Sequence, residues 1–270
     1  MRLFFILFMC LTLPTWAKAT PIQPKWEVGV FLGMLSVPQY MGSNERYQLT
    51  FPMPYFTYRS KHLRVTGQGV RTSLFKNHDL TLDASFGAGL PVKNGNQARI
   101  GMPNLPFTLQ AGPRLNWQLQ HNTSEDVRVR LPIRWNMDTS FHGVGWLFEP
   151  EILRTKRITP AWSYRLSAGA LFATQAYQER FYSVPAAYAT ANRPAYQAKG
   201  GLHSVFLRVA SYYHYDDNLF IMFASRYRNM QVGTIAASPL VKKTHDFSVF
   251  LGVSYRFWQS DEKIEDDEEE

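Results

Sequence analysis

The chain has 270 residues, 45% of them apolar and 19% charged, with 19 Phe, 14 Tyr, 7 Trp and a single Cys. So many aromatic residues exclude a disordered protein, and a mean hydropathy of −0.26 excludes a bundle of membrane helices. The formal net charge of +8 divides unevenly, because residues 261–270 hold eight acids and one base.

The chain begins with the pattern of a secretory signal peptide. Arg2 precedes an apolar stretch from Leu3 to Leu13, and the small-residue pattern Ala17-Lys18-Ala19 predicts cleavage after Ala19. Eleven apolar residues are too few for a helix that spans a membrane, which needs roughly 20. The prediction is therefore a signal peptide over residues 1–19 and an exported chain, without the thiol of Cys10, from residue 20 onward.

The exported body is basic. Without Arg2, Lys18, Lys263 and the acids of residues 261–270, residues 20–260 keep 26 bases and 13 acids, a formal +13. Export argues against nucleic acid as a partner, so anionic envelope polymers and lipids are the expected partners of this charge.

Segments of about ten residues with period-2 alternation recur along the chain, separated by turn-rich stretches, and no segment after residue 19 has helical periodicity. In chain order these segments are 26–35, 51–58, 80–90, 109–119, 127–137, 146–152, 162–173, 201–215, 219–228 and 247–257. In the clearest one, Val127 to Met137, every odd position is apolar and the even positions include Arg128, Arg130 and Arg134. The fold class is therefore all-β.

Strand length and loop length favour a membrane barrel over a soluble β-sandwich. Sandwich strands have about five or six residues, whereas transmembrane barrel strands have 9–11, face lipid with apolar side chains and have long loops at one end. Here the connections 36–48, 92–106, 174–200 and 229–243 are long and alternate with short turns. The sequence predicts an antiparallel transmembrane β-barrel over residues 20–258, in the outer membrane of a Gram-negative cell, in contact with lipid and lipopolysaccharide.

The strand count depends on residues 63–75. The alternation changes phase there, around Gly67-Gln68-Gly69, so the chain has either a tight turn or a β-bulge at that point. A barrel with both ends in the periplasm needs an even number of strands. The turn gives about twelve strands, which we prefer. A bulge would leave eleven, so another segment would have to be merged or dropped, which gives ten.

A charge ladder is expected inside the barrel. Arg128, Arg130 and Arg134 face inward on one strand, and Glu149 and Glu151 face inward on the next. These side chains could form a selectivity filter for anionic solutes, or ion pairs that fill and stiffen the lumen, and the second interpretation is favoured. We find no convincing catalytic residues, no metal-ligand spacing and no cofactor site.

The last strand ends on the pattern Gly252-x-x-Tyr255-x-Phe257, which is typical of the signal that the barrel insertase recognises at the end of an outer-membrane protein. Residues 259–270 follow it, and their acidic composition predicts a disordered tail. The insertase must therefore accept a signal that is internal to the chain.

Several short motifs carry a family likeness whose order and spacing span nearly the whole exported chain. They are Tyr40-Met41-Gly42-Ser43, Pro52-Met53-Pro54-Tyr55, Gly101-Met102-Pro103-Asn104-Leu105, Ala111-Gly112-Pro113-Arg114-Leu115, Phe181-Tyr182-Ser183-Val184, Arg193-Pro194-Ala195-Tyr196, Ala236-Ala237-Ser238-Pro239-Leu240 and Ser254-Tyr255-Arg256-Phe257. By these motifs the chain resembles the MipA/OmpV family of Gram-negative outer-membrane proteins. It departs from the family at Ala191-Asn192-Arg193, where members tend to have Ser-Gly-Leu.

The resemblance implies a non-enzymatic scaffold that links a murein lytic transglycosylase with a murein synthase in cell-wall assembly. The residues by themselves imply an outer-membrane barrel with a basic, narrow or plugged lumen. A narrow porin-like channel for small solutes, anionic ones included, and a surface adhesin that acts through the long loops are the alternatives.

Overall fold

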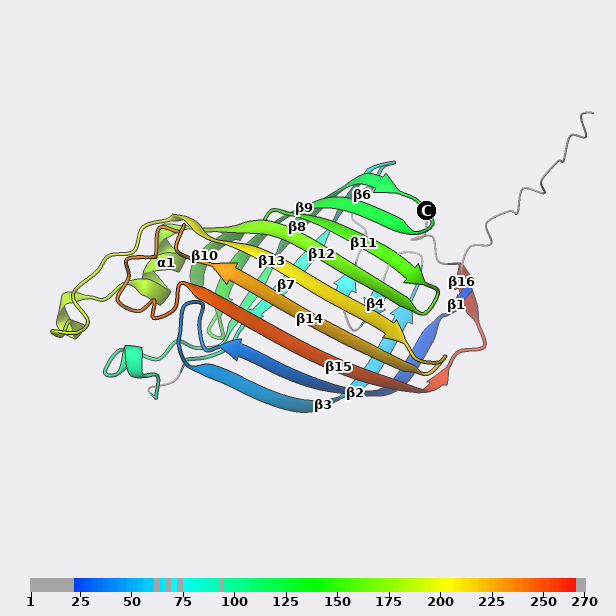
Figure 1. Ribbon diagram of the computed structural model, residues 1–270, viewed down its shortest axis with the longest axis horizontal. Coiled ribbons are helices and arrows are strands. Elements are labelled where there is room, and N and C mark those ends of the chain that lie inside the picture. Colours follow the sequence, from blue (N-terminus) through cyan, green and yellow to red (C-terminus); the bar gives the residue numbers. More distant parts are fainter. Residues whose placement is uncertain (1–21, 61–63, 67–68, 72–74, 93–94, 266–270) are drawn as a thin grey trace, which may run out of the picture.

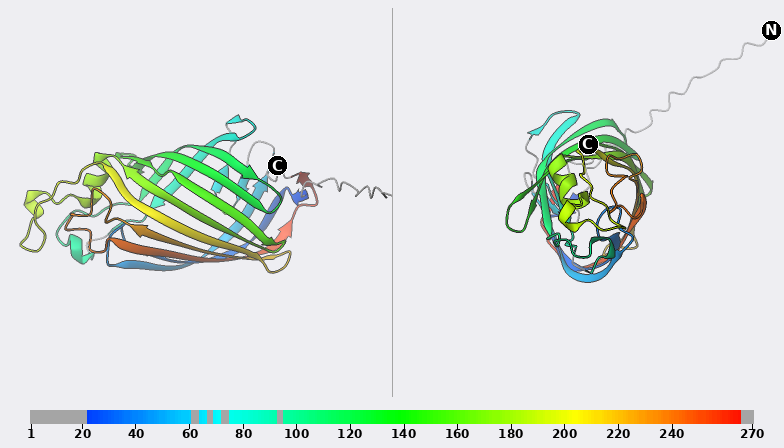
Figure 2. Two further views of the ribbon diagram at one scale, coloured as in Figure 1. Left: turned by 45° about the horizontal axis from the view of Figure 1, so that its top comes forward. Right: turned by 90° about the vertical axis from the view of Figure 1, so that its left-hand side faces the viewer.

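The computed structural model describes residues 22–60, 64–66, 69–71, 75–92 and 95–265. The predicted signal peptide, residues 1–19, lies outside these ranges. Antiparallel strands wind into a barrel, with long loops at one end and the first and last described segments, residues 22–24 and 263–265, toward the other (Figures 1 and 2). We call these the loop end and the terminal end.

Fourteen strands form the main sheet, in the order β5-β4-β3-β2-β15-β14-β13-β12-β10-β9-β8-β7-β6, with β11 pairing with β12 and β9. Their bounds are β2 Trp26–Pro38, β3 Arg46–Arg59, β4 Arg64–Thr66, β5 Gly69–Arg71, β6 Phe75–Lys76, β7 Leu80–Gly89, β8 Thr108–His121, β9 Glu125–Asp138, β10 Gly143–Phe148, β11 Glu151–Thr159, β12 Trp162–Ala173, β13 Gly201–His214, β14 Leu219–Asn229 and β15 His245–Gln259.

The strand count depends on two interruptions. β10 and β11 both pair with β9 and β12, so together they make one crossing of the barrel. β5 and β6 lie on either side of residues 72–74, which are outside the described residues, and pair with β4 and β7. Counting β10 with β11 once, the described residues form ten long strands together with the short β4, β5 and β6, so the choice between twelve strands and ten stays a prediction. The tight turn expected at Gly67-Gln68-Gly69 agrees with the pairing of Thr66 opposite Gly69.

Alternation sets the two faces of the wall, as predicted. Outward apolar side chains such as Trp117, Ile133 and Phe247 are about half exposed, at 50%, 45% and 56%, where lipid would cover them. Inward polar side chains such as Asn136 and Ser167 are buried. No helix in the described part of the chain is long and apolar enough to cross a membrane.

The long loops contain the only helices described, α1 Gln175–Tyr182 and the short 3-10 turns η1 Gln97–Arg99 and η2 Ala186–Tyr188. At the terminal end, β1 Ile22–Pro24 pairs with β16 Lys263–Glu265 in a separate two-stranded sheet.

The acidic tail differs from its prediction. Residues 259–265 were expected to be disordered, but Gln259 is the last residue of β15 and residues 263–265 form β16. The cause is a partner that composition does not reveal, because β1 supplies backbone pairing, and Lys25 Nζ lies 3.0 Å from Glu262 Oε2. Residues 266–270 lie outside the described ranges.

Candidate functional site

The charged side chains of the lumen centre on Glu149, which lies with Pro150 in the short break between β10 and β11. Proline has no N–H to give to a sheet ladder, so a strand is readily interrupted at such a residue. Gly169 on β12 makes the close approach possible, since a Cβ there would lie 2.4 Å from the Pro150 carbonyl oxygen and 2.9 Å from Glu151 Cβ. The break places two carboxylates side by side on the inner wall.

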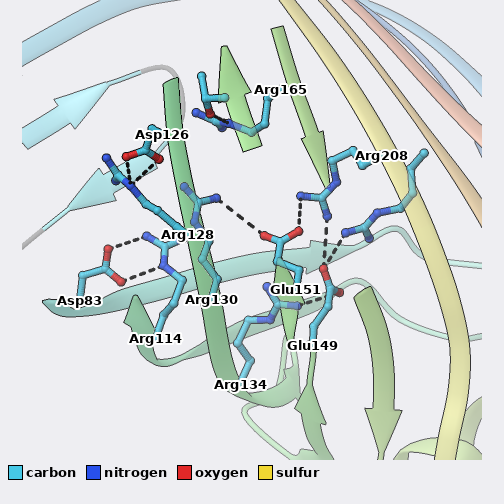
Figure 3. Close-up of polar contacts among 12 residues, drawn as sticks. Asp83, Arg114, Asp126, Arg128, Arg130, Arg134, Glu149, Glu151, Arg165 and Arg208 are labelled. Atoms are coloured by element: carbon cyan, nitrogen blue, oxygen red, sulfur yellow. Dashed lines mark hydrogen bonds and ion pairs between the residues drawn. The ribbon is translucent and has the colours of Figure 1, made fainter. Parts of the chain in front are cut away.

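Four arginines surround these two carboxylates, and we call the six residues the lumen network (Figure 3). Glu149 accepts hydrogen bonds from Arg134 Nη2 at 3.1 Å, Arg226 Nη2 at 2.6 Å and Arg208 Nη2 at 3.3 Å. Glu151 lies 3.7 Å from Arg130 Nη1 and 3.3 Å from Arg208 Nη1. Arg208 therefore bridges the two carboxylates, and the network extends from β9 to β14.

The lumen network carries a positive excess. It has four guanidinium groups against two carboxylates, a formal +2, and all six side chains are between 7% and 29% exposed. The ring of Phe206 supports it from one side, with Arg226 Cζ 4.4 Å and Arg208 Cζ 5.4 Å from the ring centroid. The arrangement can hold the inner walls together, and its excess of guanidinium groups can attract anions.

The predicted ladder differs at one residue. Arg130 and Arg134 approach the two glutamates, but Arg128 pairs with Asp126, whose Oδ1 lies 2.7 Å from Arg128 Nε (Figure 3). The register explains this, because Arg128 stands opposite Leu153 on β11 rather than opposite a carboxylate, and Asp126 lies two residues away on the same face.

The prediction also missed Arg208 and Arg226. Both fall at inward positions of the predicted segments 201–215 and 219–228, so the alternation that places Phe206 inward would have found them. Nothing in the sequence shows that these two side chains reach Glu149, which is three strands away from Arg226 in the sheet order.

Four long loops pack into an apolar plug at the loop end, which we call the loop cap. Its fully buried members come from three of the loops, namely Val92, Tyr182, Val184, Ala198, Met230, Ile235 and Leu240. Tyr182 on α1 lies at its centre, with its hydroxyl 3.0 Å from the Met41 carbonyl oxygen and 2.9 Å from His203 Nε2. The family motifs of four loops thus meet in one core across the mouth of the barrel.

Polar side chains tie the loops of the cap together. Tyr40 donates its hydroxyl hydrogen to the Leu240 carbonyl at 2.7 Å, and burial raises the pKa of Tyr40 to about 12. Burial likewise raises the pKa of Tyr177 to about 12. Arg99 donates to the Phe181 carbonyl at 3.0 Å, and burial lowers the pKa of its guanidinium. These hydrogen bonds join loops that are far apart in sequence, so the cap behaves as one folded unit.

Arg193 lies where the sequence departs from the family pattern, and its side chain links two loops. Its Nη1 donates to the carbonyl oxygens of Ala98 at 3.1 Å and Ile100 at 2.9 Å, and its Nη2 donates to the Tyr188 carbonyl at 2.8 Å. The guanidinium connects the loop of residues 90–107 with that of residues 174–200.

The three residues of the predicted insertion signal lie on β15. Gly252 faces the lumen, where a Cβ would come within 2.8 Å of the Phe31 ring and 3.0 Å of Phe250. Tyr255 and Phe257 face outward, 43% and 53% exposed, with ring centroids 5.4 Å apart. Their role in insertion stays a prediction.

No group of three or more potential metal ligands occurs among the residues that the structure describes. Near the loop end, the carboxylate of Asp138 accepts the backbone N–H of Ser140 and of His142, each at 2.9 Å. These three residues form a tight turn between β9 and β10.

The model of one protein family, described as MltA-interacting protein MipA, matches residues 30–257. The chain belongs to the MipA family. This membership places it in the outer membrane as a β-barrel, in agreement with the strand pattern. No curated protein is similar enough in sequence to count as a relative.

The chain is similar to several solved outer-membrane proteins, at low identity and with TM-scores below 0.5. An outer-membrane channel from Pseudomonas putida F1 is 10% identical with a TM-score of 0.46, and the match covers 90% of this chain and 99% of that one. A bacterial polysaccharide outer-membrane secretin is 8% identical with a TM-score of 0.44, over 86% and 99%. The NanC porin is 11% identical with a TM-score of 0.38, over 85% and 100%.

Proposed function

We propose that this MipA-family chain is a non-enzymatic scaffold that holds a murein lytic transglycosylase, together with a murein synthase, at the inner face of the outer membrane. The long loops then lie outside the cell and the terminal end faces the periplasm, as is usual for barrels of this class. The family's description names an interaction with a transglycosylase, MltA, and this chain inherits the expectation from its membership.

The observation that carries the proposal is the loop cap. Tyr182, Met230, Ile235 and Leu240 have no exposed surface, so a solid apolar core lies across the mouth of the barrel. A diffusion channel needs an open path for water and solute, whereas a scaffold needs a rigid barrel with a free periplasmic surface. The β1–β16 sheet at the terminal end supplies such a surface.

Two measurements on the purified full-length protein test the proposal. Immobilised protein should capture a purified lytic transglycosylase saturably, and the same protein in planar bilayers should give no steady conductance. Steady single-channel steps together with no capture of the enzyme would contradict it.

A narrow channel for small anions is the second candidate, favoured by the formal +2 of the lumen network. It predicts steady, anion-selective conductance that Arg208→Gln reduces. Conductance that Arg208→Gln leaves unchanged would exclude the network as its filter.

A further inference from the structure

The outer wall of the barrel is not uniform at the loop end. On β9, β10 and β12 the outward side chains stay apolar up to the rim, as at Trp135, Trp146 and Phe172. On β15, β2 and β3, which lie side by side in another sector of the wall (Figure 1), the outward residues nearest the loops are polar or basic, namely His245, Ser36, Gln48 and Arg46. One sector of the rim therefore differs in chemistry from the rest.

The register shows that these side chains point outward. Val249 stands opposite Ser36, and Ser36 stands opposite Gln48, so the three share one face of the sheet. Val249 belongs to the lipid-facing surface, where it is 37% exposed. His245 and Arg46 lie an even number of residues from Val249 and Gln48 on the same strands, so they face outward as well.

Arg46 is held in place by oxygen atoms of two neighbouring strands. Its Nη2 donates to the Phe247 carbonyl on β15 at 2.6 Å and to the Ser36 carbonyl on β2 at 3.0 Å, and its Nε donates to Ser36 Oγ at 3.2 Å. The guanidinium thus reaches from β3 across β2 to β15. These bonds use Nε and Nη2, which leaves Nη1 for an acceptor outside the protein.

Two lysines lie in the loop that packs beside Arg46. The backbone N–H groups of Lys242 and Lys243 donate to the Gly42 carbonyl at 2.8 and 3.0 Å, which brings the loop before β15 against the loop before β3. Both lysines are exposed, as is Arg46. We call Arg46, Lys242 and Lys243 the basic rim patch.

No carboxylate among the described residues pairs with the basic rim patch. The nearest acids in the sequence are engaged elsewhere. Glu45 Oε1 accepts the backbone N–H of Gln97 at 2.6 Å, and Asp246, which is buried, has its Oδ1 3.5 Å from Arg228 Nη1. The patch therefore presents three positive charges to the surroundings of the barrel, and an anion that lies against it is attracted.

Aromatic and aliphatic residues follow the patch in the direction of the terminal end. Phe247 is 56% exposed, and its ring centroid lies 5.0 Å from that of Tyr227, whose hydroxyl lies 2.6 Å from His245 Nδ1. Next along β15, Val249 and Leu251 are each 37% exposed. Positive charge at the rim and apolar surface beneath it match the headgroup and the acyl chains of an anionic membrane lipid.

We propose that the basic rim patch binds the phosphate groups of lipopolysaccharide in the outer leaflet, with the acyl chains of the lipid against Phe247, Val249 and Leu251. The long loops of such barrels are extracellular, so the patch lies at the level of the outer-leaflet headgroups. Guanidinium groups form charge-assisted hydrogen bonds with phosphate, and lysines add point charges. The sequence predicts contact with lipopolysaccharide for the barrel as a whole, and the patch gives this contact a place and a chemistry.

The charge of the lipid favours lipopolysaccharide over a phospholipid as the occupant. A phosphate monoester, as in the lipid A anchor of lipopolysaccharide, carries about two negative charges, whereas the phosphodiester of a phospholipid carries a single one. Three neighbouring cations are therefore matched better by lipid A.

Native mass spectrometry of the purified full-length protein, titrated in detergent with lipid A, tests the proposal. Lipid A should bind saturably, and excess inorganic phosphate should not displace it, because free phosphate lacks acyl chains. Dephosphorylated lipid A and phosphatidylglycerol should each bind at least about ten-fold more weakly. A basic residue near an anionic lipid surface contributes about 1 kcal/mol, so Arg46→Gln should weaken binding about five-fold.

The double variant Lys242→Gln, Lys243→Gln keeps the backbone hydrogen bonds to Gly42 and should weaken binding roughly 25-fold, at about five-fold for each charge. The matched control is Arg180→Gln. It removes one exposed positive charge at the same end of the barrel, but from α1, which packs against β10, and it should leave binding unchanged. Heat-modifiable migration on gels reports the assembly of every variant.

The proposal is overturned if assembled wild-type protein shows no saturable binding of lipid A, or if inorganic phosphate displaces the lipid. It is also overturned if dephosphorylated lipid A or phosphatidylglycerol binds as tightly as lipid A. Equal effects of Arg180→Gln and the patch variants, or unchanged binding in the lysine double variant, would likewise overturn it. Capture of a transglycosylase does not enter this test, so the scaffold and the basic rim patch can fail independently.

Discussion

Neutralising Glu149 should destabilise the barrel more than neutralising any exposed acid. Glu149→Gln keeps the shape of the side chain but removes the charge that Arg134, Arg208 and Arg226 share. At an effective dielectric of about 20, two unit charges roughly 3 Å apart attract by ~5 kcal/mol, and the cost of burying them offsets much of this. Removing one partner leaves the other charges buried and unpaired, which costs roughly 3–5 kcal/mol.

Glu125→Gln is the matched control. Glu125 also pairs with an arginine, Arg154, but their side chains are 21% and 46% exposed, so the change should cost at most about 1 kcal/mol. Equilibrium unfolding in denaturant, with the protein in lipid vesicles, measures both variants. Equal unfolding midpoints for Glu149→Gln and Glu125→Gln would refute the view that the lumen network stiffens the barrel.

Three further outcomes are expected. Phe141→Gly should stabilise the β9–β10 turn by about 1 kcal/mol in the same unfolding assay, because Phe141 has a φ of 60° and is 79% exposed; a loss of stability would contradict this. The cap should be fully stable below pH 10 and loosen as the pH rises from 10 to about 12, because burial raises the pKa of Tyr40 and Tyr177 and favours their neutral forms. Absorbance at 295 nm follows the ionisation of tyrosine. Titration of both residues at pH 10 would count against a buried cap. Phe257→Ala should impair membrane assembly whereas deletion of residues 261–270 should not, as read from heat-modifiable migration on gels; the opposite pattern would place the insertion signal in the tail.

The wall of the barrel could be predicted from the sequence because its signal is local. Each residue of a strand faces lipid or lumen according to whether its position is odd or even. Ile133 and Arg134 can therefore be assigned to opposite faces without any knowledge of the neighbouring strands. Ion-pair partners are not local in this sense. Arg128 and Arg130 both face inward on β9, between the same two strands, β8 and β11. Only the register, which places Glu151 opposite Arg130, decides which of them reaches a glutamate.

The loop cap could not be predicted for a related reason. Its loops have no periodicity, and the burial of Tyr182 depends on Met41, His203 and Ser238, which lie in three other parts of the chain. The motifs of the family likeness did mark these segments, but only as separate short matches. Five of the eight motifs, those in the loops, converge in one core, and each of the five contributes buried side chains or hydrogen bonds to the same plug.

The two ends of the barrel are held together by different interactions. At the loop end, apolar packing and hydrogen bonds across loops fix the cap, and little of the chain there is free to change shape. At the terminal end, the two-stranded sheet of β1 and β16 stands apart from the main sheet, and Lys25 pairs there with Glu262. The two ends are therefore stabilised differently, by an apolar core at the loop end and by backbone pairing with one exposed ion pair at the terminal end.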